Sequence, residues 1–79
     1  MDLQIRLEGI FRSVFFELEG VDQKLLFGAT KVSVATWDSA QHLLLLTCIE
    51  EEFEIRIPDD VAIELDSFVQ LKAYILSLG

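Results

Sequence analysis

The segment Trp37–Phe53, with the sequence WDSAQHLLLLTCIEEEF, begins with a helix-initiating pair and continues through an unbroken run of helix-forming residues. The carboxylate of Asp38 can cap a helix N-terminus, and Gln41, three positions later, completes a pattern like a capping box. The sequence therefore predicts a helix that starts at this point, with Ser39 in its first turn.

At about 100° per residue, this helix would sort its side chains onto two faces. The face predicted to join the core holds His42, Leu45, Leu46, Ile49 and Phe53. The opposite face holds Ala40, Leu44, Thr47 and Glu51. Because Leu44 is a large apolar side chain among small, polar and acidic ones, this second face is a candidate for docking a protein. A single exposed leucine is also ordinary, so the pattern alone leaves docking and plain exposure open.

Ser39 has a position that suits chemistry with phosphate. Its hydroxyl is expected beside the free backbone N–H groups of a helix N-terminus, where the helix dipole favours negative charge. A phosphodiester built on the Ser39 oxygen would be well placed there. The simpler interpretation is that Asp38 and Ser39 only cap a helix, and position alone does not separate the two.

Composition limits the class of protein. The chain has 79 residues, enough for one small domain spanning residues 1–79, and 52% of them are hydrophobic, which argues against disorder. A formal net charge of −8 opposes binding to a nucleic-acid backbone or an anionic membrane. Residues 43–46 are expected to form only a short buried apolar patch, far below the roughly 18 residues that span a bilayer. With no signal-peptide pattern at the N-terminus, a cytoplasmic protein without membrane insertion is expected.

Acidic residues are concentrated between Glu50 and Asp66, where Arg56 is the one basic residue. This acidic run is either a solvated surface or a field that steers basic partner proteins. The lone Cys48 excludes an intrachain disulfide, and no metal-ligand spacing is present, so no metal site is expected. Ser39 and His42 lie three positions apart on one helix without a matching carboxylate, and the sequence therefore predicts no catalytic residues. For His42, a structural or cavity-mouth role is expected.

The N-terminal half is predicted to contain one further helix. Apolar residues at intervals of three and four define its buried face, which comprises Leu3, Leu7, Ile10, Phe11, Val14 and Leu18. This helix is expected to end near Gly20, a natural left-handed cap. Residues 21–37 are interpreted as a long ordered connection that turns at Gly28 and packs on the bundle through Leu25, Leu26, Phe27, Val32 and Val34.

The C-terminal part is predicted to contain two helices. Pro58 sets the backbone for a short helix around residues 59–63, with Asp59 and Asp60 in its first turn. Ser67 and Gln70 have capping-box spacing, and the helix that follows is expected to run almost to Gly79. Its predicted buried face comprises Phe68, Leu71, Ile75 and Leu78.

Taken together, several of these features resemble the acyl carrier protein family. They are Asp38-Ser39, the apolar helix after it, Glu50-Glu51-Glu52-Phe53, Ile57-Pro58-Asp59 and a last helix with Tyr74 and Ile75. The resemblance covers about half of the chain. In that family the serine of an Asp-Ser-Leu motif is esterified with 4′-phosphopantetheine, which implies Ser39 as the attachment site, with Asp38, Trp37 and His42 around it. With Trp37 directly before the motif and His42 three residues after the serine, the sequence looks like the specialised, stand-alone carriers of secondary pathways more than the housekeeping fatty-acid carrier.

The sequence departs from the family pattern at two positions. Ala40 replaces the usual large apolar residue after the serine, and Leu44 stands where fatty-acid carriers commonly have a glutamate. Both lie on the face that partner enzymes contact in the family. The resemblance implies a docking surface made of Ala40, Leu44, Thr47, Glu50, Glu51 and Asp59. The departures leave open which transferase modifies the chain.

The resemblance implies an all-α fold, a small four-helix bundle with three longer helices, a short third helix and a long connection between the first two. It implies a carrier that performs no catalysis itself and presents an acyl or aminoacyl thioester to other enzymes. Its expected partners are a phosphopantetheinyl transferase, a loading ligase and downstream synthases or transferases, with the carrier itself a monomer. An unmodified carrier-like interaction module is the main alternative, and a helical adaptor or a small hydrolase using Ser39 are others.

Overall fold

The structure is a computed structural model that describes residues 2–78. Within this range the chain forms five α-helices and a short 3₁₀ segment, with no β-strand. The elements are α1 (Leu3–Val14), η1 (Phe16–Leu18), α2 (Gln23–Phe27), α3 (Ser39–Phe53), α4 (Asp59–Ala62) and α5 (Phe68–Ser77). Met1 and Gly79, the two ends of the expected domain, lie outside the described residues. None of the described helices has the length and apolar character needed to cross a membrane.

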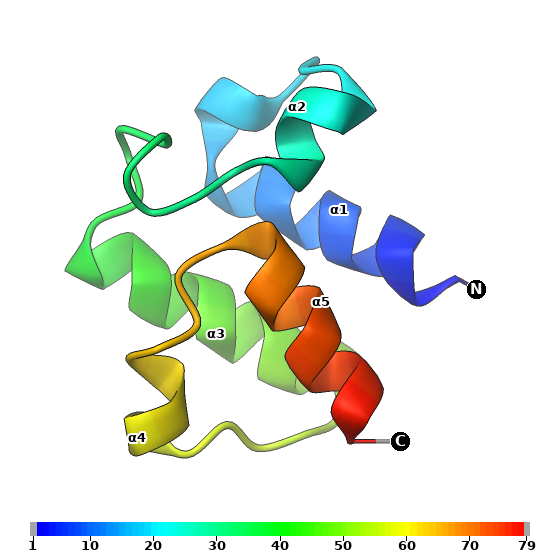
Figure 1. The fold of residues 1–79 in the computed structure, drawn as a ribbon, viewed down its shortest axis with the longest axis vertical. Helices are drawn as coiled ribbons and strands as arrows, with labels where there is room; N and C mark the ends of the chain where they lie inside the picture. Colours follow the sequence, from blue (N-terminus) through cyan, green and yellow to red (C-terminus); the bar gives the residue numbers. More distant parts are fainter. Residues whose placement is uncertain (1, 79) are drawn as a thin grey trace.

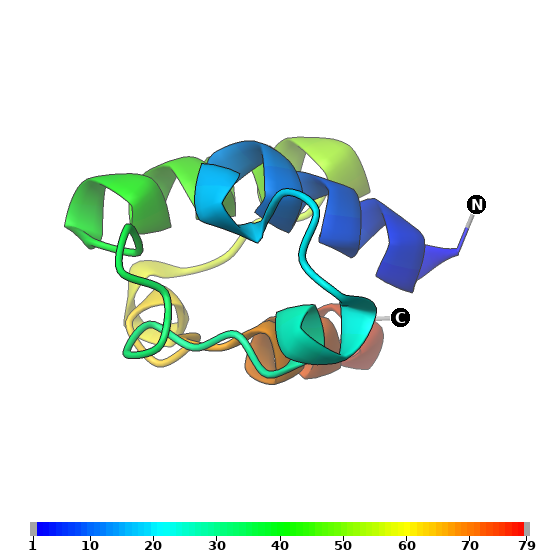
Figure 2. The same cartoon turned by 90° about the horizontal axis from the view of Figure 1, so that it is seen from above.

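The helices lie in two layers that enclose one core (Figures 1 and 2). Helices α1 and α3 form one layer, and α2, α4 and α5 form the other. The molecule measures 29 × 29 × 17 Å along its principal axes. The predicted all-α class is therefore confirmed, with α1, α3, α4 and α5 as the four expected helices and α2 as an addition to them.

Side-chain caps define where the helices begin. The carboxylate of Asp38 accepts a hydrogen bond from the backbone N–H of Gln41 at 2.9 Å, and the hydroxyl of Ser67 accepts one from the N–H of Gln70 at 3.1 Å. Both predicted start sites are thus confirmed. The Gln41 side chain does not complete a capping box, because its amide donates to the carbonyl of Val14 in α1 at 3.0 Å.

The first helix is shorter than the sequence predicts. The expectation that it continues to Gly20 is wrong, because Phe15 leaves the helical conformation (φ −109°, ψ 94°) and α1 ends at Val14. The break lets the chain turn through η1 while the Phe15 ring stays fully buried, 5.0 Å from the Trp37 ring between centroids. Gly20 has a φ of 81°, so the left-handed turn is at the expected residue but ends η1 instead of α1.

The connection between α1 and α3 contains the unpredicted helix α2, which Asp22 caps by accepting from the N–H of Lys24 at 2.9 Å. Leu26 and Val34 are buried as expected, whereas Leu25 and Val32 are exposed, and their predicted packing is wrong. In a helix of five residues, Leu25 and its neighbour Leu26 point in directions about 100° apart. Val32 lies in a tight turn closed by reciprocal hydrogen bonds between Thr30 and Ser33, which leaves its side chain in solvent.

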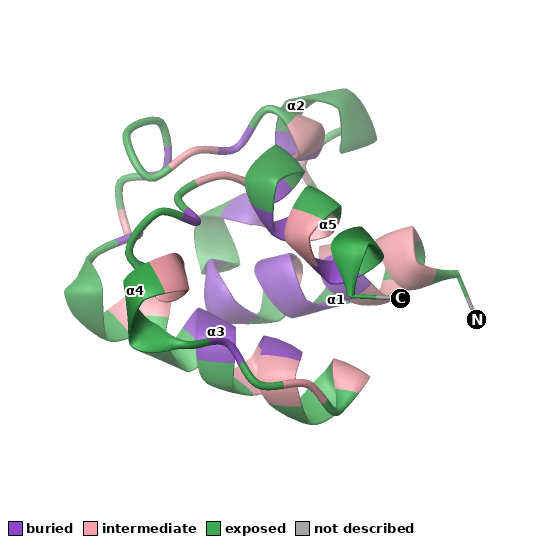
Figure 3. Ribbon diagram, turned by 60° about the horizontal axis from the view of Figure 1, so that its bottom comes forward, coloured by how far each residue is buried: buried purple, intermediate pink, exposed green. Residues whose placement is uncertain are grey.

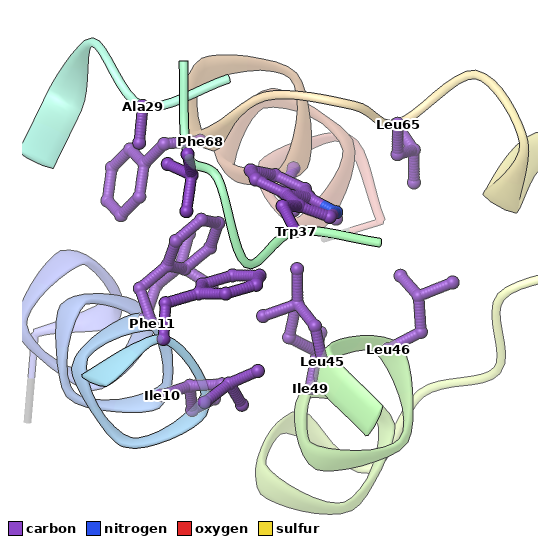
Figure 4. Packing of buried hydrophobic residues seen from close by; sticks show 14 of the residues in the cluster. Ile10, Phe11, Ala29, Trp37, Leu45, Leu46, Ile49, Leu65 and Phe68 are labelled. Atoms are coloured by element: carbon purple, nitrogen blue, oxygen red, sulfur yellow. The ribbon is translucent and has the colours of Figure 1, made fainter. Parts of the chain in front are cut away.

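Figure 3 shows which parts of the helices are buried, and an aromatic cluster forms the centre of the core (Figure 4). The ring of Phe11 in α1 contacts Phe68 in α5, with 4.9 Å between centroids, and Trp37 in the connection, with 5.6 Å. Each such pair stabilises the fold by about 0.5–1.5 kcal/mol beyond simple burial. Phe11 therefore joins the two layers to the segment that precedes Ser39. Of the expected last-helix face, Leu78 alone is exposed, because α5 ends at Ser77.

Replacing Phe11 by alanine is expected to destabilise the fold by about 3–5 kcal/mol, the usual penalty for truncating a buried phenylalanine. Phe16→Ala is a matched control, because Phe16 is 73% exposed and Phe11 is fully buried. The free energy of unfolding in urea measures both, and Phe16→Ala should change it by less than about 0.5 kcal/mol. Equal losses in the two variants would contradict this assignment of the core.

Candidate functional site

Ser39 is the first residue of α3 and is exposed to solvent. The neighbouring Asp38 carboxylate caps the helix, so the Ser39 hydroxyl is not required for that task. The first turn of α3 accordingly lies on the surface in Figure 3. As the first residue of the helix, Ser39 belongs to the turn whose backbone N–H groups have no acceptor within the helix. This arrangement suits an acceptor oxygen or an anion at the Ser39 position.

A surface cavity of about 270 Å³ lies beside Ser39. Its lining comprises Lys31, Ser39, His42, Leu43 and Ile63. Leu43 and Ile63 give it apolar walls, although their side chains are 66% and 78% exposed. The expectation that residues 43–46 form a buried patch is wrong for Leu43 and Leu44, which are both exposed, and confirmed for Leu45 and Leu46, which are buried.

Lys31 reaches this cavity because the connection is fastened to the start of α5. Its backbone N–H donates to the carbonyl of Asp66 at 2.8 Å, and the N–H of Phe68 donates to the carbonyl of Ala29 at 3.0 Å. Thr30 and Ser67 form an isolated antiparallel bridge between these two contacts. The backbone of Lys31, eight residues before Ser39 in sequence, is thus fixed beside the start of α5, and Lys31 lines the cavity at Ser39.

Trp37 and His42 form a hydrogen-bonded chain between the core and α4. The indole Nε1–H of Trp37 donates to Nδ1 of His42 at 3.0 Å, and Nε2 of His42 lies 2.9 Å from the carbonyl oxygen of Ala62. Trp37 is 3% exposed and its ring packs on Phe11 and Phe15 in the core, and its contact with a substituent on Ser39 stays a prediction. His42 is half-buried and lines the cavity, in agreement with a cavity-mouth role.

The segment before Ser39 is held from the other side by Glu17 in η1. Its Oε1 accepts hydrogen bonds from the hydroxyl of Thr36 at 2.5 Å and from the backbone N–H of Thr36 at 2.8 Å. The Thr36 hydroxyl, followed by the Thr36 N–H, lowers the pKa of Glu17 below its ordinary value. Together with the burial of Trp37, this contact fixes the approach of the chain to Asp38.

The expected docking residues divide into two groups. Ala40, Leu44, Thr47 and Glu51 are exposed on the outer face of α3, and Asp59 is exposed in the first turn of α4. Glu50 differs from them, because it is half-buried and its carboxylate accepts from the backbone N–H of Ile57 at 2.8 Å. Glu50 therefore holds the chain between α3 and α4. Only part of the Glu50 side chain is accessible to a partner protein.

A second, larger hollow of about 610 Å³ lies on the other side of α3, against α1. Its lining comprises Ile5, Arg6, Gly9, Ile10, Ser13, Cys48, Glu51 and Glu52. Arg6 pairs with Glu52 at 2.8 Å and lies 4.6 Å from the centre of the Phe53 ring. In residues 2–78 no three potential metal ligands come together.

Sequence reasoning missed three of the residues that line the cavity at Ser39. Leu43 could have been found, because it follows Ser39 by four positions and therefore shares its side of the helix. Lys31 and Ile63 had no such signal, because they lie outside α3 in sequence and only the folded chain brings them to the same cavity.

Thr36→Val is expected to raise the pKa of Glu17 toward its ordinary value, because one of the two donors is lost. A carboxyl group with a lowered pKa in the folded state stabilises the fold above its unfolded pKa and loses that contribution as the pH falls. The variant should therefore be less stable than the parent near neutral pH, and the difference should shrink on acidification. Carboxyl NMR titration and urea unfolding at several pH values measure the two effects. An unchanged Glu17 pKa would contradict the contact.

Comparison with protein-family models finds no family that matches this chain, and a search of curated proteins gives no significant match. The resemblance to acyl carrier proteins therefore rests on the residues between Trp37 and Ile75 themselves. The family and the function that it implies are accordingly a proposal.

Proposed function

We propose that this chain is an acyl carrier protein that holds an acyl or aminoacyl group as a thioester on 4′-phosphopantetheine attached to Ser39. The observation that carries the proposal is an exposed serine at the N-terminus of α3 whose capping role is taken by Asp38. The residues that resemble the family support it, because they surround this serine in sequence.

The groups around Ser39 fit an anionic ester. A phosphate on the serine oxygen would lie beside the N-terminal amides of α3 and next to a cavity that Lys31 also lines. Leu43 and Ile63 would give the apolar part of a pantetheine arm a surface to contact. When bound, the arm supplies a thiol that forms the thioester.

The attachment step balances with coenzyme A as donor. The Ser39 oxygen forms a bond to the phosphorus that carries pantetheine, and the pyrophosphate bond of coenzyme A breaks. Adenosine 3′,5′-bisphosphate leaves, and a base of the transferase takes the serine proton. The carrier itself contributes position, because a tethered thioester has a high local concentration at each partner active site.

The proposed partners are a phosphopantetheinyl transferase, an acyl- or aminoacyl-loading ligase and downstream enzymes of fatty-acid, polyketide or related biosynthesis. The outer face of α3 presents Leu44 among Ala40, Thr47 and Glu51, a small apolar centre with an acidic edge. The net charge of −8 attracts basic enzyme surfaces over a long range and speeds their encounter. A cytoplasmic monomer that meets these enzymes transiently fits the proposal.

Incubation with a phosphopantetheinyl transferase and coenzyme A should add the mass of one phosphopantetheinyl group to the intact protein. Ser39→Ala should remove the increment completely, because no other hydroxyl is the proposed attachment site. Ser13→Ala is the matched control, since Ser13 is an exposed serine near the C-terminal end of α1, and this variant should be modified normally. Intact-protein mass spectrometry measures all three.

An absence of any increment with several transferases would overturn the carrier function. It would favour the unmodified interaction module, for which Ala40 in place of a large apolar residue is the supporting departure. Modification of the Ser39→Ala variant would show instead that the attachment site is wrong.

Leu44→Ala is expected to lower kcat/KM of the transferase for this carrier roughly tenfold, the effect of losing about 1.4 kcal/mol at an interface. Leu76→Ala is the matched control, because Leu76 is an exposed leucine on α5, away from the proposed docking face. Initial rates of holo-protein formation measure the ratio. A similar decrease in both variants would count against docking through α3.

A further inference from the structure

We propose that the hollow between α1 and α3 is a docking groove for a partner protein, and that the segment it binds is a basic amphipathic helix with a large apolar side chain over Gly9. The hollow, of about 610 Å³, is larger than the cavity at Ser39, and the proposed carrier function makes no use of it. The inference therefore does not depend on what Ser39 carries.

The hollow follows the line along which α1 and α3 lie side by side in one layer (Figure 2). Arg6 near the start of α1 pairs with Glu52 near the end of α3. Gln41 near the start of α3 is bonded to Val14, the last residue of α1. The two helices are therefore antiparallel, and the space between them is a linear groove.

The wall that α1 contributes is open to solvent. Ile5, Gly9 and Ser13 are exposed, lie four positions apart and span about 12 Å along one side of the helix. Ile10, which is buried, and Cys48, which is half-buried, line the same hollow and make its floor apolar. This length corresponds to about two turns of a bound helix, enough for apolar anchors one turn apart.

Gly9 keeps the groove open. A methyl group at this position would meet no atom outside its own stretch of helix within 4 Å, so packing within the chain does not require a glycine. The backbone does not require one either, because Gly9 has the ordinary conformation of α1. Glycine in a helix interior destabilises the helix relative to alanine, and it allows another group to approach the backbone closely. An open space of this kind fits the approach of a second chain.

The charges around the groove favour a basic partner. Within residues 2–78, the ion pair at the groove joins Arg6 to Glu52, so the exposed carboxylate of Glu51 is available to a cation of the partner. The net charge of −8 attracts a basic segment over a long range. The same charge opposes a second copy of this chain and an anionic membrane surface.

The apolar floor favours a helix as the occupant. An extended segment would bring unpaired backbone N–H and C=O groups against Ile10 and Cys48, whereas a helix bonds these groups within itself. Apolar side chains one turn apart on that helix would contact Ile5 and fill the space over Gly9. Lysine or arginine residues beside this apolar face would lie near Glu51.

Gly9→Ala tests whether the glycine serves the fold. The substitution should raise Tm by about 2–8 °C, because alanine is favoured over glycine in a helix interior and its methyl group meets open space. Thermal unfolding followed by circular dichroism measures the shift. A lower Tm would overturn the proposal, because the glycine would then be needed for packing within the chain.

The binding test uses the unmodified protein and a synthetic peptide of about 15 residues, long enough to form a helix on binding. The peptide contains only leucine and lysine, with leucines at intervals of three and four so that one helical face is apolar. It should bind roughly tenfold or more tightly than a peptide of the same composition without an apolar face. Replacing its lysines by glutamates should abolish binding. Fluorescence anisotropy measures Kd, and the NMR signals of the Gly9 and Ser13 amides should shift.

Gly9→Leu fills the groove and should weaken binding of the leucine–lysine peptide roughly tenfold or more, to the level of the peptide without an apolar face. Ala73→Leu is the matched control, because it adds the same side chain at an exposed position of α5, in the other layer, and it should keep the parent affinity. Ser13→Leu fills the groove near its other end, so the test stays decisive if Gly9→Leu does not fold.

Three results would overturn the proposal. One is equal peptide affinity in the parent and in both groove variants, and another is a set of NMR shifts confined to the acidic residues 59–66. The third is a parent protein that sediments as a dimer and becomes monomeric in Gly9→Leu, because the occupant would then be a second copy of this chain. Each of these results leaves the modification of Ser39 unaffected, so they are distinguishable from a failure of the carrier function.

Discussion

Burial of the Trp37 side chain is the constraint on which the site depends. The indole is almost completely removed from water between Phe11 and Phe15, yet it carries an N–H group that must have an acceptor. Nδ1 of His42 is that acceptor, and Nε2 of the same ring lies within hydrogen-bond distance of the Ala62 carbonyl oxygen. Burial of this one side chain therefore links the position of the connection to the ring nitrogen of His42 that accepts a hydrogen bond, while the other ring nitrogen contacts α4.

The N-terminus of α3 is held in place by contacts from three separate segments. Glu17 in η1 binds Thr36, Gln41 binds the carbonyl of Val14 at the end of α1, and the Trp37 ring packs in the core. These contacts leave Ser39 exposed while fixing the backbone on both sides of it. The proposed carrier function would use such a rigid base, because the mobility would then be in the substituent and not in the protein.

The capping role at the start of α3 belongs to Asp38 and not to the adjacent Ser39. Asp38 satisfies the backbone N–H of Gln41, which leaves the neighbouring hydroxyl without a structural task. The same division extends to the acidic residues that follow. Glu50 is committed to the backbone of Ile57, whereas Glu51 and Asp59 remain at the surface, where they add to the field around α3 and α4. Acidic residues that look equivalent in sequence thus differ in what they can offer a partner.

The sequence by itself determined the helical class and the starts of α3 and α5, because capping residues and helical periodicity are local properties. Only the tertiary structure decided the end of α1 at Val14, the exposure of Val32 and the arrival of Lys31 and Ile63 beside Ser39. Phe15 leaves the helix where the chain turns toward η1 and the aromatic cluster forms, and Lys31 is placed by backbone bonds to a segment more than thirty residues away. These features depend on contacts between distant parts of the chain, and local sequence patterns therefore do not predict them.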